Sequence, residues 1–343
     1  MTGVSKVSIN GSIPYNEEFY KSVGSVSSLD IIVALLIDIV KPDSVVDFGC
    51  AKGAALSCFK ARGVKEILGV DGHWVDENSL LIDNSEFKEH DFSKGPLTLQ
   101  KQYDLAISTE VAEHLSESDA KNFVNSIVSA SDVIAFSASI PGQGGENHIN
   151  EQWPGYWAEE FHMHGYQAID CLRNRIWCNP QVEFWYKQNL LLFCKKDKVS
   201  SLNLDYDIEP MHDIVHPVQY EQTLLRLFSL FNQFYIQQDY DTIIQLSFLK
   251  DYDYSAKFFL GLSYFEKQDY ENSIDCLESF LLLSGLSDNT LFAAAYYTIS
   301  NAFIKLANYQ RAKENLEKCI TIDSGYKEAA TKMLLTINNF LDK

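Results

Sequence analysis

The chain has 343 residues, 46% of them hydrophobic and 22% charged, which is enough for about two globular domains. Its net charge of −19 argues against nucleic acid as a substrate, because most of such a surface repels a polyanion. The N-terminal segment is polar and no apolar run approaches about 18 residues, so we expect a cytoplasmic protein without a membrane span. The seven cysteines form no CxxC pair and are expected to be reduced thiols.

From about residue 28 to 195, short apolar runs alternate with helix-like stretches. The strand candidates are Ser44–Phe48, Glu66–Val70, Phe87–His90, Leu105–Ser108, Val133–Ser139, Gln167–Leu172 and Asn189–Phe193. Helices are predicted at 28–40, 53–62, 76–82 and 117–130. This alternation favours a mostly parallel sheet covered on both faces. The segment between the last two candidates is too short and irregular for a clear crossover helix, so we expect an antiparallel edge hairpin there.

The C-terminal part of the chain has a wholly helical pattern. A polar stretch that contains Pro210 and Pro217 precedes it and is typical of a linker. We therefore expect a first domain at residues 1–198, a linker at 199–218 and a helical domain at 219–343.

Three versions of one turn and helix start recur in the helical part: QQDYDTII, KQDYENSI and LANYQRAK. Their tyrosines, Tyr240, Tyr270 and Tyr309, are 30 and 39 residues apart. These spacings bracket the period of about 34 residues of tetratricopeptide repeats, and the stretch ISNAFIKLANYQRAKENLEKCITID resembles such a repeat strongly. The resemblance implies an all-α repeat domain that binds a protein partner or drives self-association. A helical bundle that only adds stability is the alternative.

The segment SVVDFGCAKGAALSCF predicts a strand that ends in Asp47, a tight glycine-containing loop and a helix. Such a loop brings the backbone and the free N–H groups of a helix start close to a ligand. Asp71 ends the next strand, where a carboxylate can accept hydrogen bonds from both hydroxyls of a ribose. Asp91 and Phe92 follow the third strand. In this order, the three acids predict a pocket for an adenosine-type cofactor.

Two cofactors compete for this pocket. A nicotinamide dinucleotide fold expects G-x-G-x-x-G, and from Gly49 the chain places alanine at both later glycine positions, residues 51 and 54. The pattern Asp47-x-Gly49-x-x-x-Gly53 instead resembles the D-x-G-x-G-x-G loop of Rossmann-like S-adenosylmethionine methyltransferases, with Ala51 in place of the middle glycine. YDLAISTEVAEHL and QNLLLF extend the resemblance. It implies a seven-stranded, mostly parallel α/β sheet, and leaves a nicotinamide oxidoreductase as a distant alternative.

The resemblance also implies the residues that bind S-adenosylmethionine. Those beside the methionine part are Asp47, Gly49, Cys50, Ala51 and Gly53. Those at the ribose are Asp71, Gly72 and His73. Asp91 and Phe92 would bracket the adenine, and Thr109 and Glu110 would lie under the sulfonium.

The sequence Glu110-Val-Ala-Glu113-His114 follows the fourth strand candidate. On a helix, its two carboxylates and imidazole would share one face. The pattern resembles the metal motif of O-methyltransferases that act on a catechol or on the end of small RNAs, with His148 as a further ligand. Oxygen ligands suit Mg²⁺ or Mn²⁺, and histidine shifts the preference toward Mn²⁺ or Zn²⁺. The alternative is a histidine that only packs or caps.

The segment from Pro141 to Tyr186 is expected to determine the substrate. Its glycine-rich start is typical of a lid, and its aromatic, amide and acidic residues suit a small hydroxylated molecule or a glycan, unless the aromatic residues simply cover the sheet. Our first hypothesis is O-methylation, with His148 as general base and His114 as the second catalytic candidate. The alternative is a protein methyltransferase or scaffold that docks a protein on the repeats.

Overall fold

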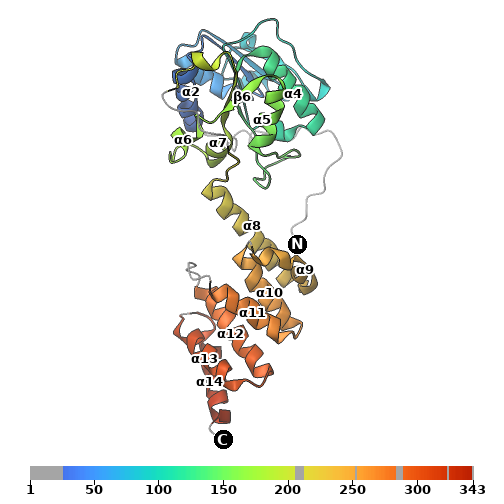
Figure 1. The fold of residues 1–343 in the computed structure, drawn as a ribbon, viewed down its shortest axis with the longest axis vertical. Helices are drawn as coiled ribbons and strands as arrows, with labels where there is room; N and C mark the ends of the chain where they lie inside the picture. Colours follow the sequence, from blue (N-terminus) through green and yellow to red (C-terminus); the bar gives the residue numbers. More distant parts are fainter. Residues whose placement is uncertain (1–25, 205–211, 252, 283–288, 323, 342–343) are drawn as a thin grey trace. The chain divides into compact units, whose positions relative to one another are not determined.

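The computed structural model describes residues 26–204, 212–251, 253–282, 289–322 and 324–341 (Figure 1). The chain divides into two compact units between Tyr220 and Glu221. No helix in the described part of the chain combines the length and the apolar character needed to cross a bilayer.

The first unit is built on the predicted seven-stranded sheet. Its strands are β1 (Ser44–Phe48), β2 (Glu66–Asp71), β3 (Phe87–Glu89), β4 (Leu105–Thr109), β5 (Val133–Ser137), β6 (Tyr166–Ile169) and β7 (Leu191–Lys195), in the order β3-β2-β1-β4-β5-β7-β6. The first five strands are parallel, and β7 runs antiparallel to both neighbours. The Rossmann-like α/β fold and the edge hairpin are thus confirmed.

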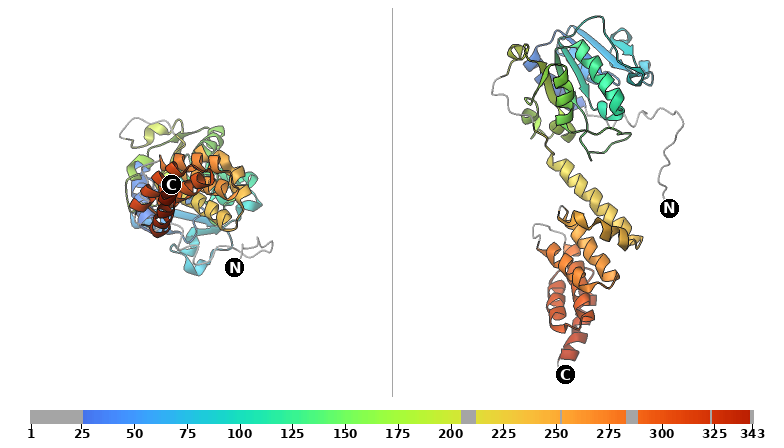
Figure 2. Two further views of the ribbon diagram at one scale, coloured as in Figure 1. Left: turned by 90° about the horizontal axis from the view of Figure 1, so that it is seen from below. Right: turned by 45° about the vertical axis from the view of Figure 1, so that its right-hand side comes forward.

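Helices cover both faces of this sheet, as predicted (Figure 2). They are α2 (Val26–Val40), α3 (Ala54–Ala61), α4 (Glu117–Ala130), α5 (Pro154–Met163), α6 (Arg173–Ile176) and α7 (Phe184–Asn189). Neighbouring residues of β1 show the two-sided burial, because Val45 belongs to the core under α2 and α3, and Val46 to the core under α4 and α5.

The predicted helix at 76–82 is wrong. Only Glu77–Ser79 forms a 3₁₀ turn, and the Asp76 carboxylate accepts hydrogen bonds from the Asn78 amide and side chain. Short polar side chains that bind nearby backbone compete with helix formation, which explains the difference.

The second unit consists of helices. They are α8 (Pro217–Ile236), which begins in the first unit, α9 (Tyr240–Gln245), the 3₁₀ helix η6 (Leu246–Asp251), α10 (Tyr254–Glu266), α11 (Tyr270–Leu281), α12 (Asn289–Lys305), α13 (Tyr309–Thr321) and α14 (Lys327–Leu341). The three repeat tyrosines each start a helix. The residue before each of them accepts a backbone hydrogen bond as N-cap, and the residue before that has positive φ. One turn geometry therefore recurs three times.

Candidate functional site

The loop after β1 has the backbone that the sequence pattern implied. Gly49, Ala51 and Gly53 have φ of 82°, 48° and 80°, so all three lie in the left-handed region. The amides of Gly49 and Cys50 both donate to the Val70 carbonyl of β2, at 2.8 and 3.2 Å. These bonds fix the loop at the carboxyl edge of the sheet, in front of α3.

Asp71 lies at the end of β2 and joins this loop directly. Its Oδ2 accepts from the Ala51 amide at 2.7 Å, and its Oδ1 accepts from the Gly72 amide at 2.7 Å and from Trp74 Nε1 at 2.9 Å. Trp74 was not among the predicted residues. A Cβ at Gly72 would lie 2.3 Å from the Trp74 ring, so glycine there lets the indole approach the carboxylate.

Asp47 is the second buried acid of this region, with 5% of its surface exposed. Burial, and then the charge of Asp71, raise its pKa well above the usual range of an aspartate. Two buried acids of like charge at one edge of the sheet suit a cationic ligand, which would offset both effects.

Two predicted adenine contacts have other partners. The Asp91 carboxylate caps a short 3₁₀ turn, where it accepts from the Ser93 amide at 3.0 Å and hydroxyl at 2.7 Å. Phe92 is 5% exposed and packs edge-on against Phe123, with ring centroids 4.6 Å apart. Phe92 is thus mainly a core residue, and a contact between its ring and the adenine stays a prediction. His73 is exposed and lies beside Trp74.

The Glu110–His114 segment is not a helix that presents one face, as the sequence suggested. Glu110 has a φ of 56°, and only Ala112–His114 forms a 3₁₀ turn. Val111 packs directly on the cofactor loop, because a Cβ at Gly49 would lie 2.4 Å from its Cγ2. The segment is therefore an immediate neighbour of the predicted methionine site.

The Glu110 carboxylate lies in a network of buried polar side chains. Its Oε1 accepts from Asn189 Nδ2 at 3.3 Å, and its Oε2 accepts from Ser139 at 3.1 Å and Gln143 Nε2 at 3.2 Å. Sequence reasoning missed these partners and Gln188, which donates to Gln143. The available signal was the pair Gln188-Asn189 immediately before an apolar strand.

Three of the four predicted metal ligands come together: Glu113, His114 and His148. Each offers a ligand atom, and these atoms lie within 4.8 Å of one another. Glu113 is fully buried, and its Oε2 accepts no hydrogen bond from the described residues. Burial, and then the charge of Glu110, raise its pKa well above the usual range of a glutamate. A proton or a bound cation would compensate this carboxylate.

The two histidines belong to different segments. Burial, with a smaller contribution from His148, lowers the pKa of His114 to about 4, so its ring is neutral at neutral pH. His148 lies with its ring centroid 4.8 Å from that of His114, and its Nδ1 is 3.0 Å from Glu151 Oε1. If Nδ1–H donates to this carboxylate, Nε2 is left as the basic nitrogen.

The loop that carries His148 is fixed at several points. Glu151 also accepts from the amides of Gly142 and Gly144, at 2.8 and 2.7 Å, and the Glu113 carbonyl accepts from Ile149 and Asn150. Of the aromatic residues after it, Trp157 and Tyr186 are buried core residues, and Trp153 is 39% exposed. Tyr156 and Trp185 are partly buried and pack against the same cores, so most of these aromatic residues cover the sheet. Tyr186 is also hydrogen-bonded to Thr109.

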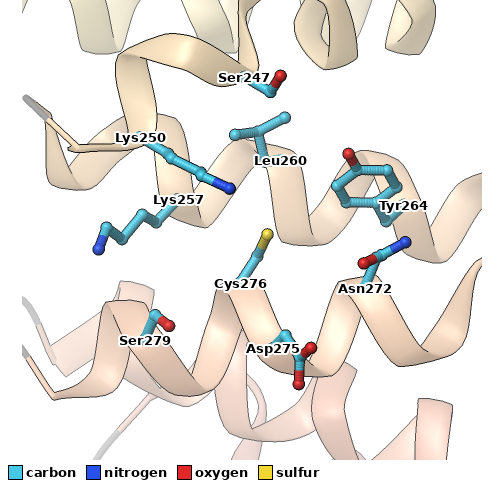
Figure 3. Close-up of a pocket in the computed structure, with 9 residues that line it drawn as sticks. All are labelled: Ser247, Lys250, Lys257, Leu260, Tyr264, Asn272, Asp275, Cys276 and Ser279. Carbon is cyan, nitrogen blue, oxygen red and sulfur yellow. The ribbon is translucent and has the colours of Figure 1, made fainter.

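The second unit contains a pocket of about 250 Å³ between η6, α10 and α11 (Figure 3). Its lining includes Lys250, Lys257, Tyr264 and Asn272, together with the buried Leu260. Figure 3 shows the Lys250 ammonium pointing toward the middle of this group, and Asp275 pointing away from it. Within the described residues neither lysine forms an ion pair, unlike Lys267, which pairs with Asp241.

Comparison with known families agrees with both units. Residues 27–168 match a family model described as a methyltransferase domain, and residues 254–284 and 293–326 match a tetratricopeptide repeat model. The first match spans β1 to β5 and reaches into β6, and the second covers the helix pairs α10–α11 and α12–α13. The first Tyr240 repeat lies outside the repeat matches.

Solved structures with similar folds are distant from this chain. The sugar N-methyltransferase KedS8 from a Streptoalloteichus species is 10% identical, with 57% of this chain and 99% of that chain covered and a TM-score of 0.42. Human N-acetylserotonin methyltransferase is 16% identical, with 52% of this chain and 54% of that chain covered and a TM-score of 0.36. Magnesium protoporphyrin IX methyltransferase from Synechocystis is 16% identical, with 55% of this chain and 86% of that chain covered and a TM-score of 0.38. The chain thus spans about half the length of the human enzyme. No curated protein sequence matches it significantly.

Proposed function

We propose that this chain, a Rossmann-like S-adenosylmethionine-dependent methyltransferase with C-terminal tetratricopeptide repeats, methylates a hydroxyl group of a small molecule or a glycan. The observation that carries the proposal is the place of His148. It lies in the loop after β5, against His114 of the segment after β4, and Val111 of that segment packs on the cofactor loop after β1. These three strands are neighbours in the sheet, so their carboxyl ends lie side by side, which supports a single site there.

S-adenosylmethionine supplies a methyl group on a sulfonium. The chain's own residues then have two tasks, namely holding the cofactor and taking up one proton. Asp71 would bind the ribose, and Asp47 would bind the cationic methionine part. His148, oriented by Glu151, would accept the proton of the acceptor hydroxyl while the hydroxyl oxygen bonds to the methyl carbon and the bond from sulfur to that carbon breaks, which leaves S-adenosylhomocysteine.

A metal ion fits the same group of residues. Glu113, His114 and His148 would hold it, in place of the four ligands expected from the sequence, since the Glu110 carboxylate is already bound by Asn189, Ser139 and Gln143. Two imidazoles and one carboxylate favour Mn²⁺ or Zn²⁺ over Mg²⁺. Such an ion would lower the pKa of a coordinated substrate hydroxyl, and His148 would then be a ligand instead of the base.

Metal binding has a test that does not need the substrate. Calorimetric titrations with Mn²⁺ and with Zn²⁺ should give a binding isotherm for the native chain with at least one of the ions, and none for Glu113→Gln, which keeps the shape of the side chain. Glu159→Gln, on α5 and outside the cluster, is the matched control and should bind like the native chain. Absence of Mn²⁺ and Zn²⁺ binding by the native chain would leave His148 as the base.

The reaction is tested by release of S-adenosylhomocysteine. The purified chain is incubated with S-adenosylmethionine and with either the small-molecule or the protein fraction of a cell extract, with EDTA or Mn²⁺ in parallel. Product from the small-molecule fraction supports the proposal, and its loss with EDTA supports the metal. Product from the protein fraction alone contradicts a small-molecule acceptor.

The pocket on the repeats favours a second candidate function, docking of a protein. Within the described residues the two lysines form no ion pair, and together with the Leu260 side chain of the same lining they suit an acidic segment of a protein substrate. Lys250→Glu with Lys257→Glu would then lower turnover of the protein fraction and leave turnover of small molecules unchanged. Lys305→Glu, an exposed lysine of α12, is the control. Equal turnover by all three proteins would reject docking at this pocket.

A further inference from the structure

The residues that leave the first unit are more than a linker. We call residues 212–219 the exit segment; it lies beyond the domain end at 198 that the sequence suggested. His212 accepts a hydrogen bond through its carbonyl from Arg173, a side chain only 1% exposed. The His216 ring packs against Trp177, with centroids 4.7 Å apart. The exit segment is therefore attached to the methyltransferase fold.

One contact of the exit segment completes a helix start. The N-cap of α5 is Trp153, whose side chain cannot cap, and the Asp213 carboxylate accepts from the Gly155 amide at 2.9 Å. An anionic acceptor at this position satisfies a free N–H and interacts favourably with the helix dipole. Asp213 thus fixes the chain just after the loop that carries His148.

A second contact reaches the start of the same loop. Gln219 is 2% exposed, and its Nε2 donates to the Gly142 carbonyl at 2.9 Å. The Gly142 amide in turn donates to Glu151, which is hydrogen-bonded to the His148 ring. A continuous series of hydrogen bonds therefore runs from Gln219 through Gly142 and Glu151 to His148.

A third contact joins the exit segment to the buried network around Glu110. The His216 amide donates to Gln188 Oε1 at 2.8 Å, and Gln188 Nε2 donates to Gln143 Oε1 at 3.1 Å. Gln143 then donates to Glu110. Because Gln188 is fully buried, loss of a partner would leave a polar group without compensation.

We infer that the exit segment positions the His148 loop. It holds the start of the loop at Gly142 and the helix start that follows the loop at Gly155, and it does so from residues that follow the methyltransferase sheet. Gln219 and Asp213 are positioning residues, because neither is part of the predicted cofactor or metal group. Only the importance of His148 in this inference rests on the proposed function, and the contacts themselves can be tested without a substrate.

Hydrogen–deuterium exchange of the full-length chain tests this inference. Gln219→Glu keeps the size of the side chain and removes the donor to Gly142. It should speed exchange of peptides within 142–152 by about fivefold or more, the factor expected for a hydrogen bond worth about 1 kcal/mol. Asp213→Ala should do the same for the start of α5, and Asp213→Asn, which keeps the acceptor oxygen, should restore slow exchange. Gln222→Ala, one turn further along α8, is the matched control.

A second readout concerns His148 itself. In spectra of ¹⁵N-histidine-labelled protein, with the signal assigned by His148→Asn, Gln219→Glu should shift the His148 resonance and Gln222→Ala should not. Unchanged exchange in 142–152 and an unmoved His148 signal in Gln219→Glu would overturn the inference. Faster exchange of β4 as well would mean general unfolding, and Asp213→Ala against Asp213→Asn then decides: equal exchange at α5 overturns the inference. Neither readout depends on turnover, so failure of this inference can be distinguished from failure of the proposed reaction.

Discussion

At the scale of single residues, the cofactor loop shows how a sequence pattern encodes backbone geometry. Positions 49, 51 and 53 all have positive φ, and two of them are glycine. The family pattern has glycine at the remaining, middle position as well, where this chain has Ala51. The sequence could therefore predict the loop from the residue types that its backbone requires, and the acids from their places at the ends of strands. It could not predict Trp74, because nothing local in the sequence indicates that this indole reaches Asp71.

Ala51 is expected to carry a small conformational cost. A left-handed conformation costs a non-glycine residue roughly 1–2 kcal/mol, partly offset because glycine loses more entropy on folding. Ala51→Gly should therefore stabilise the first unit by about 0.5–1 kcal/mol in urea unfolding. Ala54→Gly, in the first turn of α3, should destabilise it instead. A loss of stability in Ala51→Gly would mean that the methyl group makes a favourable contact.

Cofactor binding should depend on pH through Asp47. The pKa of this acid is raised in the free protein, first by burial and then by Asp71. A cationic methionine group would favour the carboxylate and lower that pKa, so binding should release protons and affinity should rise with pH above the usual aspartate range. Calorimetry in two buffers of different ionisation enthalpy measures the release. Proton uptake, or no exchange, in the native chain would contradict a contact between Asp47 and a cationic group.

At the scale of elements, prediction succeeded where one element carries its own signal. Strands β1 to β5 and α4 follow from apolar runs and helical periodicity, and the repeat tyrosines mark helix starts because each follows a capping residue. It failed at 76–82 and at Glu110–His114. In the first case, local side-chain hydrogen bonds replaced helix. In the second, the positive φ of Glu110 makes a turn that brings Glu113 under the loop of His148.

Close packing of two helices in the repeats predicts a sharp effect at Gly261. A Cβ there would lie 2.4 Å from Leu277 Cγ, and the Ser273 hydroxyl already donates to the Gly261 carbonyl at 2.7 Å. Gly261→Ala should therefore destabilise the second unit by about 1–3 kcal/mol, the usual cost of overpacking. Gly325→Ala meets no atom within 4 Å and is the control. Thermal unfolding that ranks the two variants equally would show that α10 and α11 adjust freely.

At the scale of the whole molecule, the sequence predicted two units. It did not predict the hydrogen bonds that join residues far apart in the chain. The buried network joins Glu110, Gln143 and Gln188, which come from distant parts of the chain, so no local pattern reveals it. The same holds for the exit segment, whose polar, proline-containing sequence is typical of a linker although Gln219 and His216 are buried. Three of the four predicted metal residues did come together, because the ends of neighbouring parallel strands meet.

The role of His148 is tested most directly by comparing the native chain with His148→Asn in two measurements on the same proteins. Calorimetry gives the affinity for S-adenosylmethionine, and release of S-adenosylhomocysteine with the small-molecule extract fraction gives turnover. We expect the two affinities to agree within about twofold and the turnover of the variant to be at least about 100-fold lower, the usual contribution of a general base. Native turnover in His148→Asn would contradict a role of His148 in the reaction, because the loop after β5 would then have a structural role only.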